Sequence, residues 1–498
     1  MTSEAPSAAP YNAPFPSSPW TQPPAEGPKG VRRWLPLVLV IGLVVGLSGA
    51  GTWFALERRG SKYPSKWDER VARLVSFVER KRGLDFEHPV EVEFLTVAEF
   101  KKRVTTDEAT LTKEDREDLE DAVSFLRAIG LVEGRIDLVD AFNQASNEGI
   151  LAFYDPEDEK ITVRGTRLDV ATRVTVVHEL THALQDQHFD IEAMRTRDDD
   201  DSSGAITALI EGDADNIENE YVDALSRRLR RQYEAQSDKA SADADFDGIP
   251  PVIRIMMGAP YEFGPALVEV LRADGGQRAL DHAFRAPPTS EEQIFDPVTY
   301  LASEEPVTVD EPNMPKGARR IDDGEFESLG WFVTLSEQVD AHVALRAADG
   351  WGGDSYVAYR TRDKQTCTRV RYRGDEPSDT LEMKVALDQW VAAVDTGRAT
   401  VSSEGETLLF QSCDPGEKAK VSTGRSLDAI NLPVVRVAIV QEFLSEGAEF
   451  DFASCVANQL VYEVSVKELS DPTSTAFTSD AGRQRIRNIA MQCRGTTA

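Results

Sequence analysis

The chain has 498 residues and a formal net charge of −31 at pH 7, with 86 Asp and Glu against 55 Lys and Arg. This length allows an extended tail and two or three compact units, because one domain usually takes about 100–200 residues. The acidity excludes nucleic-acid binding, since phosphate contacts need a basic surface, and it predicts neutral or cationic partners.

The N-terminal region divides into a tail and an apolar segment. Residues 1–33 are rich in proline, serine and alanine, a composition that predicts a disordered tail. Residues 34–56 are 23 residues without a charge. At about 1.5 Å per residue they match a bilayer core of about 30 Å, so we expect a transmembrane helix. A cleaved signal peptide is the alternative, but the long polar leader disfavours it.

The sequence also predicts how such a chain is oriented in the membrane. Basic residues are more numerous after the apolar segment than before it, which disfavours an external domain. Long domains, however, cross largely regardless of flanking charge, and the even set of cysteines suits an oxidising compartment. We therefore predict a single-pass cell-membrane protein with a cytoplasmic N-terminus and an extracytoplasmic catalytic domain.

Beyond the apolar segment the patterns predict an α+β fold in two parts. The first part, 65–302, has helical and strand periodicities in alternation, followed by a linker at 303–318 and an α+β module at 319–498. The expected elements of the first part are helices at 67–81 and 114–129, a strand at 90–96, a hairpin of 149–154 with 160–164, a helix from about 169, and helices at 205–232, 264–272 and 277–284. The segment 350–354, Gly-Trp-Gly-Gly-Asp, is expected to form a turn.

All four cysteines lie in the C-terminal module. None has the C-x-x-C spacing of a metal or redox site, so disulfides are expected. Four cysteines allow three pairings. The simplest joins Cys367 to Cys413 and Cys455 to Cys493.

The strongest chemical signal is His178-Glu179-Leu180-Thr181-His182. On a helix, histidines four residues apart lie on one face and can hold one metal ion. Imidazole and carboxylate ligands suit zinc, which lowers the pKa of a bound water to about 7. Glu179, between the histidines, is the expected general base, and His178 and His182 are the expected ligands.

A third ligand is expected from the next predicted helix. Glu211 lies 29 residues beyond His182, beside the apolar Leu209 and Ile210. A carboxylate in an apolar stretch is costly unless it is paired or bound to metal, which favours a ligand role. Asp215, one turn further, is expected to accept the far N–H of a ligating histidine. A solvated acidic helix is the alternative for this segment.

His188 is a rival third ligand. It stands ten residues after His178, the spacing of metzincins. Those enzymes use a glycine to turn the chain after the helix, whereas this sequence has Gln185 at that position. Glu211 is therefore favoured over His188.

The extended motif resembles a known family. The run H-E-L-T-H-A-L-Q-D-Q-H-F, followed by Glu211-Gly212-Asp213-Ala214, is similar to bacterial membrane-anchored neutral zinc metallopeptidases. Further similarity lies in Pro260-Tyr261-x-x-Gly264, in the segment 287–293 and in the segment 350–354. The resemblance implies a gluzincin-type catalytic domain, distantly thermolysin-like, with a small sheet over the motif helix and Asp215 orienting a zinc-bound histidine.

Two further features are weaker. An oxyanion stabiliser is expected for amide hydrolysis, and Tyr221, Tyr261 and His188 are the candidates. Asp243, Asp245, Asp247 and Gly248 resemble half of a calcium loop, but Arg254 occupies the twelfth position, where a glutamate should be. An acidic loop is therefore favoured over calcium.

Together the residues predict a zinc-dependent peptidase, with one zinc ion per chain, that hydrolyses protein or peptide substrates by metal-activated water. The alternative is a catalytically inactive zincin-fold protein that serves as a binding or scaffold protein of the cell envelope.

Overall fold

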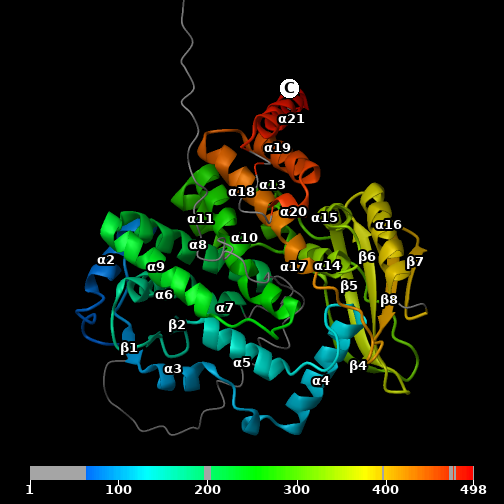
Figure 1. The fold of residues 1–498 in the computed structure, drawn as a ribbon, viewed down its shortest axis with the longest axis horizontal. Helices are drawn as coiled ribbons and strands as arrows, with labels where there is room; N and C mark the ends of the chain where they lie inside the picture. Colours follow the sequence, from blue (N-terminus) through cyan, green and yellow to red (C-terminus); the bar gives the residue numbers. More distant parts are fainter. Residues whose placement is uncertain (1–62, 196–202, 395–396, 470–474, 476–477, 497–498) are drawn as a thin grey trace, which may run out of the picture.

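The computed structural model describes residues 63–195, 203–394, 397–469, 475 and 478–496. Figure 1 shows a small sheet and a larger sheet near opposite sides of the molecule, with helices between them. The strands are β1 (Glu91–Leu95), β2 (Ala152–Asp155), β3 (Lys160–Arg164), β4 (Arg319–Gly324), β5 (Trp351–Arg360), β6 (Thr366–Gly374), β7 (Ala399–Glu404) and β8 (Thr407–Cys413).

The helices of the first part surround the small sheet and fill the centre of the molecule. They are α2 (Ala72–Arg82), α3 (Val97–Val104), α4 (Lys113–Ala128), α5 (Leu138–Gly149), α6 (Val170–Phe189), α7 (Ile191–Arg195), α8 (Ser203–Ala224), α9 (Arg227–Asp243), α10 (Pro251–Gly275), α11 (Gln277–Ala283), α12 (Glu292–Phe295) and α13 (Pro297–Ala302). The later helices are α14 (Glu327–Ser336), α15 (Ala341–Asp349), α16 (Pro377–Ala393), α17 (Ser426–Ala429), α18 (Asn431–Ser445), α19 (Phe450–Glu463), α20 (Val466–Leu469) and α21 (Asp480–Thr496).

The small sheet packs on α6. Its strand order is β1-β3-β2, with β1 parallel and β2 antiparallel to β3, so the predicted hairpin is confirmed. Val92, Ile161 and Val163 from the strands join Val177 and Leu180 of α6 in one buried cluster. Burial of these aliphatic side chains fixes the motif helix against the sheet, at roughly 1.5–3 kcal/mol for each.

Helix α6 begins and ends where its flanking residues dictate. The Asp169 side chain accepts a hydrogen bond from the Thr172 N–H at 3.0 Å, which caps the first turn. At the other end Asp190 has a φ of 55°, the left-handed conformation that terminates helices. The predicted helix from about residue 169 is confirmed, and it contains the whole histidine motif.

Helices α8 and α10 cross at two glycines. A Cβ atom at Gly212 would lie 2.1 Å from the carbonyl carbon of Gly264, and one at Gly264 would lie 2.1 Å from the carbonyl oxygen of Ala208. Neither position tolerates a side chain, so the two backbones can touch. Gly212 comes directly after Glu211, and Gly264 lies one turn after Tyr261. The contact between the two glycines therefore brings Glu211 and Tyr261 to the same part of the molecule.

The structure divides one predicted helix into two. The pattern at 205–232 suggests a continuous helix, but α8 ends at Ala224 and α9 begins at Arg227. The Ser226 side chain accepts a hydrogen bond from the Leu229 N–H and caps the new helix, so local capping overrides the apolar periodicity.

The larger sheet has the order β4-β5-β6-β8-β7, with antiparallel pairing throughout the described strands. The prediction of a turn at 350–354 is wrong, because β5 begins at Trp351 with a bulge near Gly353. The glycines serve close packing instead. A Cβ atom at Gly353 would lie 2.1 Å from the carbonyl oxygen of Val307. Asp354 is buried, and its carboxylate accepts hydrogen bonds from the Trp331 and Trp351 indoles.

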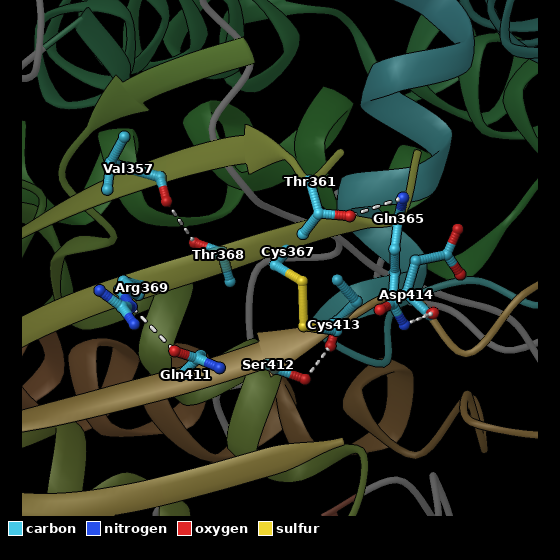
Figure 2. Close-up of a disulfide and its surroundings, with 11 residues drawn as sticks. Val357, Thr361, Gln365, Cys367, Thr368, Arg369, Gln411, Ser412, Cys413 and Asp414 are labelled. Atoms are coloured by element: carbon cyan, nitrogen blue, oxygen red, sulfur yellow. Dashed lines mark hydrogen bonds between the residues drawn. A yellow bond between two sulfur atoms is a disulfide. The ribbon is translucent and has the colours of Figure 1, made fainter. Parts of the chain in front are cut away.

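The disulfides follow the simplest of the three pairings, which is confirmed. Cys367 of β6 and Cys413 of β8 are directly opposite in the antiparallel register and form one bond. Figure 2 shows this bond crossing the two strands, with the Arg369 and Gln411 side chains joined by a hydrogen bond on the same strand pair. Cys455 of α19 and Cys493 of α21 form the second bond.

The predicted membrane span needs correction. Among the helices of the described residues, none is both long and apolar enough to cross a bilayer. The expected span at 34–56 and the disordered tail at 1–33 lie outside the described residues. The α+β architecture with disulfides is found, but the fold class with a single transmembrane helix and the single-pass localisation, with its cytoplasmic N-terminus and external domain, are not retained. The apolar run carried the prediction of the span, and the even cysteine count carried only the external placement of the domain.

The predicted linker at 303–318 does not separate two hydrophobic cores. The largest buried cluster contains Leu209 and Phe263 from before the linker and Trp331, Tyr356 and Val437 from after it. The domain boundaries stay a prediction, but the two parts share one interior within the described residues.

Candidate metal centre

Three side chains from two helices converge on one point. His178 and His182 lie one turn apart on α6, and Glu211 reaches them from α8. The His178 Nε2 and His182 Nε2 atoms are 3.0 Å apart, and they lie 3.1 and 3.2 Å from Glu211 Oε2. All three residues are buried, and their ligand atoms form a group suited to hold a metal ion.

These separations are compatible with zinc. Zinc–nitrogen and zinc–oxygen bonds of about 2.0–2.1 Å at tetrahedral angles place ligand atoms about 3.3 Å apart. The three observed distances of 3.0, 3.1 and 3.2 Å are within a few tenths of that value. Two nitrogens and one carboxylate oxygen also leave a fourth position for water, as catalytic zinc sites require.

The far side of each imidazole indicates where its proton lies. His178 Nδ1 is 3.2 Å from Asp215 Oδ1 and 3.4 Å from Glu218 Oε2. Neither carboxylate meets hydrogen-bond geometry with Nδ1. Because carboxylates only accept hydrogen bonds, this environment favours the neutral ring with its proton on Nδ1 and its lone pair on Nε2. Asp215 therefore faces the far nitrogen of a candidate ligand, as the sequence predicts, and Glu218 faces the same nitrogen atom.

His182 is held by Gln185. Its Nδ1 atom is 2.9 Å from Gln185 Oε1. The amide of Gln185 cannot be turned round, because its Nε2 donates to the Ile210 carbonyl and to Asp213 Oδ2, both at 3.0 Å. Gln185 Oε1 thus accepts from His182 Nδ1, and His182 Nε2 also presents a lone pair. With both rings neutral, three lone pairs face one another, an arrangement that a proton or a metal cation stabilises.

Behind Gln185 lies a buried ionic network. Asp213 Oδ2 accepts from Arg82 Nε at 2.6 Å, and Arg82 Nη1 donates to Asp281 Oδ1 at 2.5 Å. Arg82 and Asp213 are fully buried. Breaking such a pair leaves an uncompensated charge and costs about 3–5 kcal/mol, so the network fixes Gln185, and through it His182, against α2 and α11.

Electrostatics keep Glu211 ionised. Burial favours the neutral acid, but the charges and hydrogen bonds of His182 and His178 lower the pKa of Glu211 well below its ordinary value. Its second oxygen, Oε1, is 3.6 Å from Arg195 Nη2. For His178 burial opposes the charged ring, yet Asp215, Glu211 and Glu218 raise its pKa well above the usual range. The site therefore favours one positive charge, whether a proton or a metal ion.

Glu179 lies beside the converging group, on the same helix. Its residue is 6% exposed, and burial raises the pKa of its carboxyl group, against the charges of His178 and His182. The backbone of Tyr154 forms a hydrogen bond to Glu179, and the Tyr154 hydroxyl donates to Asp186 Oδ2 at 2.8 Å. Edge strand β2 is thereby tied to α6 at two points that lie two turns apart on one face of the helix.

The oxyanion candidates lie in different places. The Tyr261 ring is stacked near His178, with ring centroids 6.2 Å apart, and the residue remains 40% exposed. The Tyr221 ring instead contacts Phe77 edge-on, at 5.1 Å, in the core beneath the small sheet. His188 Nε2 is 2.8 Å from the Asp85 carbonyl and is not part of the converging group, so it is not brought to the metal position.

The candidate calcium loop is not assembled. Asp243 ends α9 and pairs with Lys239, while Asp245 Oδ1 accepts from the Asp247 N–H. Within the described ranges these aspartates do not form a group of carboxylates suited to a metal ion.

Sequence reasoning missed the contacts that Gln185 and Glu218 make with the candidate ligands. Both could have been found from helical spacing. Gln185 is three residues after His182, and Glu218 is seven after Glu211, so each lies on the face that carries the ligands. Tyr154 and Arg195 come from a strand and a short helix whose position near the motif follows from tertiary packing.

Comparison with known proteins adds information on the larger sheet alone. Residues 315–432 match a family described as a domain of unknown function, DUF8575. This region contains β4 to β8 with α14, α15, α16 and α17, and it does not include the candidate zinc ligands. No curated protein and no solved structure matches the chain.

Proposed function

We propose that this chain is a zinc-dependent peptidase of the gluzincin type, with His178, His182 and Glu211 as ligands. The observation that carries the proposal is the convergence of three lone pairs. Two imidazole nitrogens and one ionised carboxylate oxygen meet within 3.0–3.2 Å of one another. A buried arrangement of this kind is unfavourable without a cation, and the nitrogen-rich donor set suits zinc better than calcium or magnesium.

Each further residue has a role in peptide hydrolysis. Bound zinc would polarise the scissile carbonyl and acidify the attacking water. Glu179 accepts the proton of that water and transfers it to the leaving amine, and its raised pKa suits both steps. Tyr261, partly exposed beside His178, donates its phenol proton in a hydrogen bond to the developing oxyanion.

The packing of α8 on α10 supports the resemblance to bacterial neutral zinc metallopeptidases. That resemblance rests on separate segments of sequence, among them Glu211-Gly212-Asp213-Ala214 and Pro260-Tyr261-x-x-Gly264. The Gly212–Gly264 contact gives a physical reason for both glycines, because it allows Glu211 and Tyr261 to approach the same histidine.

A catalytically inactive binding or scaffold protein of the same fold is the second candidate. It needs the metal ligands for stability, but it does not need Glu179 as a base. A buried, partly desolvated carboxylate beside the ligands is a cost without a catalytic role, which favours the peptidase.

The test compares the wild type with Glu179→Gln, an isosteric change that leaves the ligands in place. Both proteins are loaded with zinc, their zinc content is measured, and each is incubated with a peptide library. We expect equal zinc content and a loss of cleavage of at least about 100-fold in Glu179→Gln. Equal cleavage by the two proteins, or no cleavage by zinc-loaded wild type, would reject the peptidase.

A further inference from the structure

Three carboxylates that are far apart in the sequence meet away from the candidate zinc ligands. They belong to Glu292 in α12, Glu304 just after α13, and Asp375 just after β6. One oxygen atom from each lies within 4.8 Å of the other two. The cluster therefore joins the first part of the chain to the larger sheet.

Backbone contacts hold these residues together. Gln293 Nε2 donates to the Glu304 carbonyl at 2.6 Å, which fixes the segment after α13 against α12. The Asp375 N–H donates to the Gly350 carbonyl at 3.3 Å. A Cβ atom at Gly352 would lie 2.8 Å from the Asp375 nitrogen, so the glycine permits this close approach. The glycine-rich segment at 350–353 thus shapes the cluster.

The carboxylate of Glu292 is a separate observation that points to a ligand. The residue is only 6% exposed. In the described part of the chain its carboxylate has no hydrogen bond or ion pair, and its oxygen faces those of Glu304 and Asp375. Burial, followed by the charges of Asp375 and Glu304, raises its pKa to about 10. An ionised carboxylate without a partner is costly in this buried position, and a cation would stabilise the ionised form.

A nearby guanidinium does not fill this role. Arg436 reaches the C-terminal end of α12, where its Nη2 donates to the Phe295 carbonyl at 3.0 Å. Its Nη1 donates to Asp349 Oδ1 at 2.6 Å, so its charge is already paired.

We propose that Glu292, Glu304 and Asp375 bind one hard divalent cation, Ca²⁺ or Mg²⁺, that ties α12 to the end of β6. Oxygen-only ligands with open positions for water are what these ions prefer, whereas zinc and copper favour nitrogen and sulfur. Burial falls from Glu292 through Glu304 to the exposed Asp375, which gives the ion a route from solvent. This site is independent of the proposed zinc centre.

The test is a thermal-unfolding titration of the full chain after removal of metals with a chelator. CaCl₂ and MgCl₂ are added separately, and the preferred cation should raise the Tm by about 2 °C or more near saturation. The Glu292→Gln and Asp375→Asn proteins should lose this shift. Asp375 is exposed, so its replacement leaves the fold intact even if a change at buried Glu292 does not.

Two controls separate this site from other sources of stabilisation. Glu382→Gln removes an exposed carboxylate of α16 and should keep the full shift. His178→Ala should also keep it, because the zinc centre lies elsewhere. No shift with either cation would overturn the proposal, as would a shift that survives Glu292→Gln and Asp375→Asn in folded protein.

Discussion

Gln185 offers a sharp test of how the candidate centre is built. In Gln185→Leu the side-chain volume is nearly kept, but the acceptor for His182 Nδ1 and the donors to Ile210 and Asp213 are lost. Loss of a group that orients a metal-bound histidine typically weakens metal affinity about 10–100-fold, which corresponds to about 1.4–2.8 kcal/mol. Folding should suffer as well, by about 1–3 kcal/mol for each buried polar group left without a partner.

The assay is competition for zinc against a chromophoric chelator, performed on protein shown to be folded by circular dichroism. Gln187→Leu is the matched control on the same helix, since Gln187 bonds to the Glu87 and His88 backbone and not to a ligand. We expect the zinc Kd to rise at least about 10-fold in Gln185→Leu and to change little in Gln187→Leu. A Gln185→Leu protein that binds zinc as tightly as the control would refute the inferred orientation of His182.

Three further outcomes follow from the geometry. Gly212→Ala should destabilise the protein by about 1–3 kcal/mol or more in urea unfolding, because its Cβ atom would collide with Gly264. The control Gly149→Ala, which has open space around it, should not destabilise the protein. Equal stabilities of the two variants would argue against the tight helix crossing. Glu218→Gln should weaken zinc binding, since it removes one of two carboxylates facing His178 Nδ1, and an unchanged zinc Kd would leave that role to Asp215 alone. In chelator-treated protein the unfolding free energy should fall as pH rises, because the pKa of Glu292 is raised from 4.5 in the unfolded chain to about 10. The stabilisation is complete below pH 4.5 and is lost as the pH passes through about 10, so Glu292→Gln should flatten the slope between pH 6 and 9, and parallel slopes would contradict it.

The motif helix and its surroundings were within reach of sequence reasoning. The apolar residues around His178 and His182, together with Asp169 before them, specify a buried, capped helix, and α6 forms there. Alternating residues likewise predicted β1, and two short apolar runs joined by the turn-forming segment 155–158 predicted the β2–β3 hairpin. Helix α6 is buried on every side from Val176 to Gln185, so its length and its Asp169 cap, and not one apolar face, mark it as a helix.

Tertiary packing decided what local pattern could not. The contact between Gly212 and Gly264 joins segments more than fifty residues apart. The hydrogen bonds from Gln185 to Asp213 and from Asp213 to Arg82 likewise join different helices. The segment 350–354 was expected to turn because it is rich in glycine, yet those glycines allow β5 to touch Val307 and Asp375. Glycine marks close approach as well as turns, and the sequence alone does not distinguish the two.

The most direct test of the central claim is zinc-edge anomalous diffraction from crystals of the full chain grown with zinc. The proposal predicts one strong peak within about 2.0–2.2 Å of His178 Nε2, His182 Nε2 and a Glu211 oxygen, with the Nδ1 atoms facing Asp215 and Gln185. A peak bound by His188 instead of Glu211, or no peak among these three residues, would contradict the account.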